Sequence, residues 1–375
     1  MLAANAHPGL DKIVLRAGRS YKLRIRNAAG DENAGASGDL DILDALKIRS
    51  SQKNRQATIN AKGIDRVFDL PCLFSPGCGA ATPHISATFV GLVIRGGVAN
   101  EAGGIRIDNG SVRLKNSVVR GNRAIKEGGG VYADVGSLTV SKSTVRGNSA
   151  GTDGGGIWDM VPASIRSSTI RGNGAGRNGG GIWDDEPLTV GSSTVSGNAA
   201  GGGGGGLYVI LTAATLFNDT FAGNRAAAVG GGIDVDSPKA SASINALTVA
   251  RNQAPVGGGL GVEAGTLTST NSLIAKNTAA DGPDCRSFTP AVIASAGYNL
   301  VGDTAGCTGF GAPGDLLGVN ARIAKLKNNG GRTLTIALRK GSPAINHAGP
   351  TSPRRDQRGV RRRKPDIGAY ERRTR

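Results

Sequence analysis

The chain has 375 residues, 61 of them glycine, and a formal net charge of +17. The glycines form periodic clusters without a Gly-X-Y triplet, which excludes collagen and disfavours a flexible linker. With two tryptophans, five tyrosines and seven phenylalanines, the core has to be aliphatic. A run of about 18 apolar residues is absent, so no membrane-spanning helix is predicted. The positive charge favours nucleic acid, acidic glycans or anionic membranes as partners, without choosing among them.

The first region, residues 1–84, carries short apolar runs separated by polar turns, for example at 12–15, 21–25 and 45–48. Such runs are typical of the opening turns of an all-β structure. The stretch 71–79, with two prolines and two glycines, indicates an irregular excursion that holds Cys72 and Cys78.

Residues 85–280 are dominated by a repeat of about 25 residues. Each copy places an apolar residue after a glycine cluster, and these residues are Ile105, Val131, Ile157, Ile182, Leu207, Ile233 and Leu260. A second column consists of asparagines at Asn122, Asn148, Asn173, Asn198, Asn224, Asn252 and Asn277. No copy contains the 3.6-residue pattern of a helix, and glycine and β-branched residues disfavour one.

Short strands and turns at a constant period predict one turn of a solenoid per repeat. We therefore expect a single, all-β, right-handed parallel β-helix of ten to twelve rungs. The aliphatic column would fill its bore, and the asparagines would form an internal hydrogen-bonded ladder.

Three resemblances accompany this pattern. The Gly-Gly-Ile and Ser-x-x-x-Gly-Asn elements resemble the repeats of polymorphic outer-membrane and adhesin-like β-helix proteins. The segments 3–18 and 38–42 resemble part of the CSLREA module of bacterial surface proteins, which implies that a signal peptide lies upstream of Met1. The segments 281–285, 297–303 and 356–371 resemble the choice-of-anchor Q module, so residues 281–375 are expected to form a C-terminal capping module with a basic tail.

The four cysteines fall into two local pairs, Cys72 with Cys78 and Cys285 with Cys307. No Cys-x-x-Cys spacing or nearby histidine suggests zinc. We therefore predict two disulfides and an extracellular or cell-surface location, against the alternative of four free thiols in a cytosolic protein.

A possible functional face follows the apolar column. The next position is aromatic on four consecutive rungs, at Tyr132, Trp158, Trp183 and Tyr208. Strand alternation predicts that these rings point outward and form a flat platform for sugars. The acids Asp159, Asp184 and Asp185 lie beside the rings and are counted with them as candidate ligand-binding residues. An enzymatic alternative would have to take its pair of carboxylates from these three acids and Glu186. The competing interpretations are a stabilising aromatic stack and solvated turn acids.

These observations favour a non-enzymatic, adhesin-like module that binds a glycan or another surface component. The alternatives are a polysaccharide lyase or glycoside hydrolase acting on an acidic polysaccharide, and a structural spacer. We assign no catalytic residue, cofactor or metal, and expect a monomer without a specific nucleic-acid partner.

Overall fold

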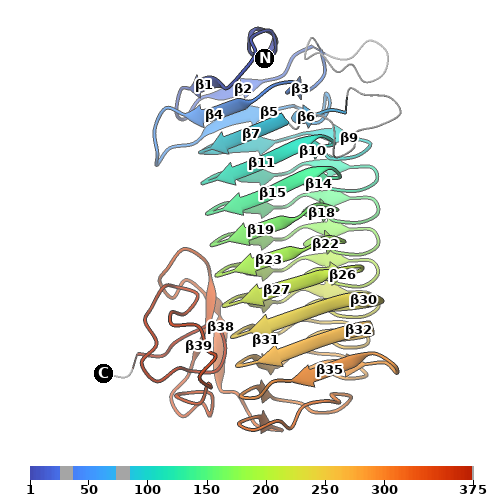
Figure 1. The fold of residues 1–375 in the computed structure, drawn as a ribbon, viewed down its shortest axis with the longest axis vertical. Coiled ribbons are helices and arrows are strands. Elements are labelled where there is room, and N and C mark those ends of the chain that lie inside the picture. Colours follow the sequence, from blue (N-terminus) through green and yellow to red (C-terminus); the bar gives the residue numbers. More distant parts are fainter. Residues whose placement is uncertain (26–36, 73–84, 374–375) are drawn as a thin grey trace.

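The computed structural model describes residues 1–25, 37–72 and 85–373. One short helix, α1 (Leu2–Asn5), precedes a chain of β-strands. The strands wind into a long rod in which successive turns stack on one another, with the N-terminus at one end (Figure 1). This is the parallel β-helix that the repeat predicts. In the described residues, no helix is long and apolar enough to cross a membrane.

The first sheet has 19 strands, and all its pairings are parallel, so each turn of chain lies directly above the next. Its strands are β1 (Asp11–Leu15), β3 (Leu40–Asp41), β4 (Leu46–Ser50), β6 (Phe68–Leu70), β7 (Ile85–Val90), β10 (Ile105–Ile107), β11 (Gly110–Lys115), β14 (Val131–Ala133), β15 (Gly136–Ser141), β18 (Ile157–Asp159), β19 (Ala163–Arg166), β22 (Ile182–Asp184), β23 (Leu188–Gly191), β26 (Leu207–Val209), β27 (Ala213–Phe217), β30 (Ile233–Asn245), β32 (Leu260–Thr270), β34 (Cys285–Ser287) and β35 (Val292–Ser295).

The second sheet has 12 parallel strands and forms another side of the rod. Its strands are β2 (Ser20–Lys22), β5 (Ala57–Asn60), β8 (Leu92–Arg95), β12 (Val118–Arg120), β16 (Thr144–Arg146), β20 (Thr169–Arg171), β24 (Thr194–Ser196), β28 (Thr220–Ala222), β31 (Thr248–Ala250), β33 (Leu273–Ala275), β36 (Leu300–Val301) and β37 (Leu316–Leu317). A narrow third sheet of six two-residue strands completes the turns between residues 98 and 226. They are β9 (Val98–Ala99), β13 (Arg123–Ala124), β17 (Ser149–Ala150), β21 (Gly174–Ala175), β25 (Ala199–Ala200) and β29 (Arg225–Ala226).

The aliphatic column fills the bore, as predicted. All seven residues that follow the glycine clusters are 0% exposed, namely Ile105, Val131, Ile157, Ile182, Leu207, Ile233 and Leu260. Full burial of one such side chain stabilises the fold by about 1.5–3 kcal/mol. The apolar position of the repeat therefore supplies the main force that stacks the rungs.

The asparagine column forms the predicted internal ladder. The side-chain nitrogen of Asn148 donates to the side-chain oxygen of Asn173 at 3.1 Å, and the same bond recurs from Asn122 down to Asn252. At the lower end, Asn277 donates to Asp284 instead. These residues satisfy buried backbone groups at the turn, so their role is structural.

The glycine clusters serve two purposes. Gly154 has a φ of +66°, a conformation that glycine adopts without steric cost. Gly155 has no positive φ, but a Cβ there would lie 2.4 Å from the backbone carbon of Gly174. The second glycine thus permits close contact between neighbouring turns.

The C-terminal region differs from the expected boundary at residue 280. Strands β34 to β37 continue the rod in parallel register as far as Leu317. Only residues 319–373, here named the C-terminal cap, leave the rod. The cap contains the antiparallel pair β38 (Ile323–Lys327) and β39 (Thr335–Leu338).

The C-terminal cap packs beside the lower rungs (Figure 1). The outer face of the second sheet is small and apolar there, so Ala222 and Ala250 share a buried cluster with Ile336 and Ile367 of the cap. Gln357 donates to Ser193 and Thr194 and accepts from Thr220, which fixes the contact.

The predicted disulfide between Cys285 and Cys307 is confirmed, with Cα atoms 5.0 Å apart. Cys285 is fully buried and continues the aliphatic column below Leu260. Cys78 lies outside the described residues, so the second predicted pair stays a prediction.

Candidate functional site

The four predicted aromatic residues occupy one column on the outer side of the first sheet. The ring centroids of Tyr132 and Trp158 are 4.3 Å apart with planes 5° from parallel. The rings of Trp158 and Trp183 are 5.0 Å apart and 6° from parallel. Tyr208 follows on the next rung. We call these four residues the aromatic column.

The structure differs from the predicted flat platform. The rung spacing of parallel strands brings the rings face to face, so that each ring covers its neighbour. Trp158 and Tyr208 are only 9% and 5% exposed, while Tyr132 and Trp183 are half-buried. Ring edges, not faces, are therefore turned outward, and the stack serves mainly to hold the rungs together.

Two of the predicted acids lie on the wrong side of the sheet for a surface site. Asp159 and Asp184 are paired in register and point into the bore, where both are 0% exposed. None of their four carboxylate oxygens has a hydrogen-bond partner. Strand alternation is the reason, because the residue two positions after a buried isoleucine returns to the interior.

Burial raises the pKa of Asp159 well above its usual value. It does the same for Asp184, where the nearby Asp159 charge adds to the shift. A bulky ligand cannot reach these carboxyls, so Asp159 and Asp184 do not join the rings in the predicted binding platform, and they supply no carboxylate pair on the surface.

Other acids remain closer to solvent. Asp185 is half-buried, and burial followed by the Glu186 charge raises its pKa. One rung below the tryptophans, the Tyr208 hydroxyl donates to Asp236 at 2.6 Å. Burial first, and then this hydrogen bond, raise the pKa of Tyr208. The hydrogen bond from Tyr208 to Asp236 thus fixes the last ring of the aromatic column.

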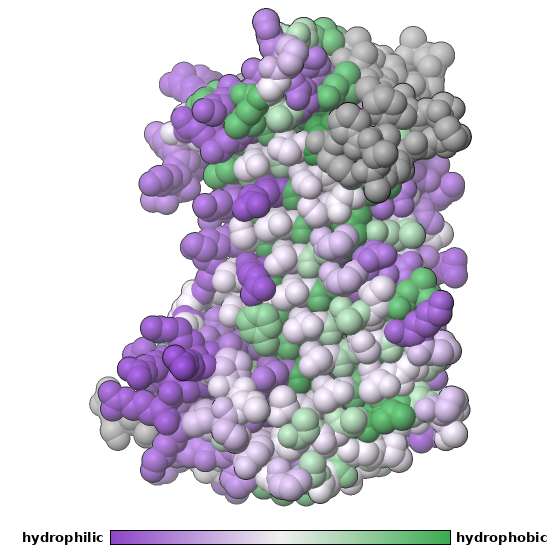
Figure 2. Space-filling view, viewed as in Figure 1, coloured by the Kyte–Doolittle hydropathy of each residue, from purple (hydrophilic) through white to green (hydrophobic). Residues whose placement is uncertain are grey.

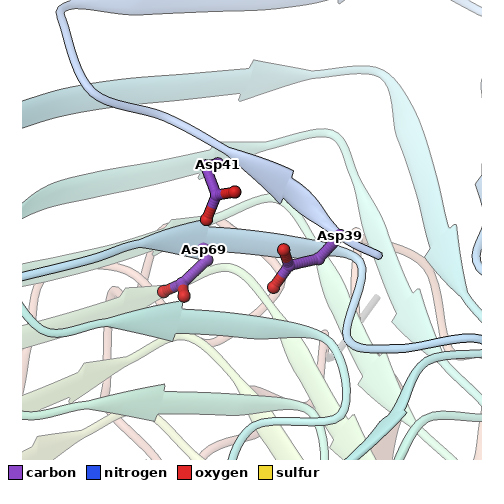
Figure 3. A group of neighbouring side chains, drawn as sticks. All are labelled: Asp39, Asp41 and Asp69. Atoms are coloured by element: carbon purple, nitrogen blue, oxygen red, sulfur yellow. The ribbon is translucent and has the colours of Figure 1, made fainter. Parts of the chain in front are cut away.

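A group of three carboxylates near the N-terminal end escaped the sequence analysis. Asp39, Asp41 and Asp69 are buried, and each offers an oxygen within 4.8 Å of the others (Figure 3). Such a group is able to hold a divalent cation. Here, however, Arg66 contacts Asp39 and Asp69, at 3.1 and 3.0 Å, and Arg106 contacts Asp69 at 2.6 Å.

These two arginines already supply positive charge to the carboxylates. Burial, and then the charges of Asp69 and Asp41, raise the pKa of Asp39 to about 8. The arrangement is an ion network between paired strands of successive rungs, and we assign it no metal.

A column of arginines on the second sheet was also missed. Arg120 pairs in register with Arg95 on the rung before and with Arg146 on the rung after, and Arg146 pairs with Arg171. We call these four residues the arginine ladder. The sequence carries the signal as Arg-Gly-Asn at 120–122, 146–148 and 171–173, where an arginine precedes the turn before each ladder asparagine.

The arginine ladder concentrates positive charge, and the described residues place no counter-ion beside it. Arg95, Arg120 and Arg146 are half-buried and Arg171 is exposed. In the described part of the chain, none of the four forms an ion pair within 4.0 Å, whereas Arg66, Arg106 and Arg286 do. Burial, and then the charges of Arg95 and Arg146, lower the pKa of Arg120.

A groove of about 520 Å³ continues from the arginine ladder along the edge of the C-terminal cap. Arg146 and Arg171 line one end and Arg251 the other. Small residues such as Ser196 and Gly197 form its floor, and Leu326 and Leu334 of the cap form an apolar wall. We call it the cap groove. Figure 2 shows hydrophilic residues gathered over the C-terminal cap, and the outline of the molecule steps inward directly above the cap.

Comparison with known proteins supports the fold alone. No family model matches the sequence, and no curated protein matches it. Among solved structures, the crystal structure of pectate lyase Pel9A is similar, with a TM-score of 0.51 and 14% sequence identity. The match covers 99% of this chain and 90% of that one. The chain therefore has the same β-helical architecture, and the resemblances to surface-protein modules stay predictions.

Proposed function

We propose that this chain is an exported protein that binds an acidic polysaccharide along the arginine ladder. The observation that carries the proposal is the register of four arginines without an acidic partner in the described residues. The guanidinium groups of adjacent rungs repel one another, which destabilises the protein without ligand. A polymer with repeated carboxylates or sulfates would neutralise these charges and remove the repulsion.

The chemistry of arginine suits such a ligand. Its planar fork of donors matches a carboxylate with two parallel hydrogen bonds, which are stronger than neutral ones. The rigid sheet holds the four side chains at a repeat of about 4.8 Å, so the ordering cost is small when a polymer binds. The similar structure acts, by its title, on pectate, which is itself an acidic polysaccharide.

Polysaccharide is favoured over nucleic acid as the partner. No aromatic residue interleaves with the arginines in the register of the second sheet, where the neighbouring positions hold valine, isoleucine and threonine. Single-stranded nucleic acid binds through such stacking residues as well as through charge. The disulfide between Cys285 and Cys307 favours an oxidising compartment, where surface polysaccharides occur.

The test is binding of the full chain to polygalacturonate, a sulfated glycan, a neutral glucan and single-stranded DNA. We expect both anionic glycans to bind, with affinity that falls as salt increases. The variant Arg120→Ala with Arg146→Ala should lose at least about 100-fold in affinity, since each charged contact contributes roughly 1.5–3 kcal/mol. Arg113→Ala is the matched control, because Arg113 is exposed on the first sheet.

Equal binding by the neutral glucan, or no loss in the double variant, would disprove the proposal. Tighter binding of DNA than of either glycan would identify a different class of partner.

A lyase acting on an acidic polysaccharide is the second candidate, favoured by the fold of the similar structure. Release of unsaturated products during the same binding experiment would establish it. Binding without product release would leave a non-enzymatic module.

A further inference from the structure

The turn that follows each strand of the second sheet is left-handed on every rung from 121 to 276. Its φ lies between +58° and +65° at Gly121, Gly147, Gly172, Gly197, Gly223, Arg251 and Lys276. Five of these residues are glycine, which adopts this conformation without a steric cost. Arginine pays a steric cost there, and it also lacks the side-chain hydrogen bond that makes asparagine tolerable. Glycine would fit this turn at a lower steric cost, so the contacts of the Arg251 side chain have to be considered.

The position of Arg251 suggests a role in ligand binding. Its side chain is exposed and lines the far end of the cap groove, three rungs below Arg171. The guanidinium donates to the Ala324 carbonyl of the C-terminal cap at 3.3 Å, which holds it against the cap at this end of the groove. Three rungs span about 14 Å at the spacing of parallel strands.

The groove between these cations is shaped for an extended chain. Glycines at the turn of the intervening rungs keep its floor open, since a Cβ at Gly197 would meet no atom within 4 Å. Leu326 and Leu334 supply an apolar wall along one side. Sugar rings have apolar C–H faces that pack on such a wall, whereas small inorganic anions gain nothing from it.

We propose that Arg251 sets the minimum length of anionic oligosaccharide that the cap groove recognises, by holding an acidic group about three rungs from Arg171. This inference rests on the proposed function and adds a length requirement to it. Oligomers too short to reach from Arg171 to Arg251 would use the arginine ladder alone. Longer ones would gain one further charge-assisted contact.

The experiment measures the affinity of size-graded oligogalacturonates for the full chain and for Arg251→Gly. For the native chain, affinity should rise about 10-fold over one or two added sugars, at the length that spans the two arginines. Arg251→Gly should bind short oligomers normally and lack this rise. Because glycine suits the left-handed turn, its melting temperature should be unchanged or higher.

Lys276→Gly is the matched control. Lys276 has the same backbone conformation and charge on the next rung, with a φ of 63°, but it does not line the cap groove. Its removal should leave the length dependence intact. A smooth increase of affinity with length in the native chain, or the same step in Arg251→Gly, would overturn the inference while leaving the proposed function standing. Failure of oligomers of every length and of the polymer to bind the native chain would overturn both.

Discussion

The aromatic column and the arginine ladder are built by the same device and have opposite energetic consequences. Each places similar side chains on successive rungs of a parallel sheet. Stacked rings attract one another and cover their own faces, so the aromatic column is satisfied within the molecule. Stacked guanidinium groups repel one another and have no acidic partner in the described residues. The aromatic column therefore stabilises the rod through its own contacts, whereas the arginine ladder lacks a partner that an anionic ligand would supply.

The first way to break this comparison is to remove a ring from the middle of the stack. Trp158→Ala should destabilise the rod by about 3–5 kcal/mol, because a nearly buried side chain with a neighbour on each side is lost. Urea unfolding measures this. Tyr132→Ala, at the half-buried end of the stack, should cost clearly less. Polygalacturonate binding by folded Trp158→Ala should be unchanged, and its loss would return the aromatic column to the candidate binding sites.

The second prediction concerns the acids behind the aromatic column. Asp184 occupies a bore position that is Val209 on the next rung, and Asp184→Val should stabilise the rod at pH 7 by about 1–3 kcal/mol. Burial raises the pKa of Asp184 in the folded state above the unfolded value of 3.8. The native chain therefore keeps the full contribution of this group below about pH 4 and loses it as pH rises toward the folded-state pKa.

The gain from Asp184→Val should thus be small near pH 4 and largest above neutral pH. Urea unfolding at both pH values tests the sign. Asp281→Asn, at an exposed ion pair, is the control and should change stability by less than about 0.5 kcal/mol. A larger gain at pH 4 than at pH 7 would contradict the stated role of burial.

The fold was predictable from the sequence because every rung is held by the same few residue types at the same positions. The glycine that allows a left-handed turn, the apolar residue that fills the bore and the asparagine that bonds to its neighbour each recur every 25 or so residues. Averaging over seven copies made each signal clear. The C-terminal cap was harder to place, since its docking depends on Ala222 and Ala250 of distant rungs.

The candidate site was only partly predictable. Periodicity correctly placed Trp158 on the outer side, but it does not say that the neighbouring rings will cover its faces. The same alternation rule that places Trp158 outside places Asp159 inside, so the acid predicted beside the ring lies behind it. The arginine ladder recurs on four successive rungs and then gives way to Ser196, Ala222 and Ala250. Among the described residues, its lack of acidic partners in space is what distinguishes it from a solvated face.

The third prediction separates charge from geometry in the arginine ladder. Arg146→Lys keeps the positive charge and loses the planar fork, so affinity for polygalacturonate should fall about 5- to 10-fold with its salt dependence retained. Arg146→Ala should lower both the affinity for polygalacturonate and its salt dependence. Titrations at two salt concentrations distinguish the cases. Identical behaviour of arginine and lysine would mean that the ladder acts only as a positively charged surface.

The smallest expected effect is the most direct test of the contrast between the columns. Without ligand, Arg120→Ala should leave the rod as stable as the native chain or more stable, by roughly 0.2–1 kcal/mol, because Arg120 lies between two like charges in register. Part of this gain is offset by lost packing of the arginine stem.

Added salt should remove the difference in stability, since it screens the repulsion between the guanidinium groups. Saturating polygalacturonate should reverse the order, so that the native chain melts at the higher temperature. A variant that is less stable at low salt without ligand would show that the arginines, like the rings, are satisfied within the molecule.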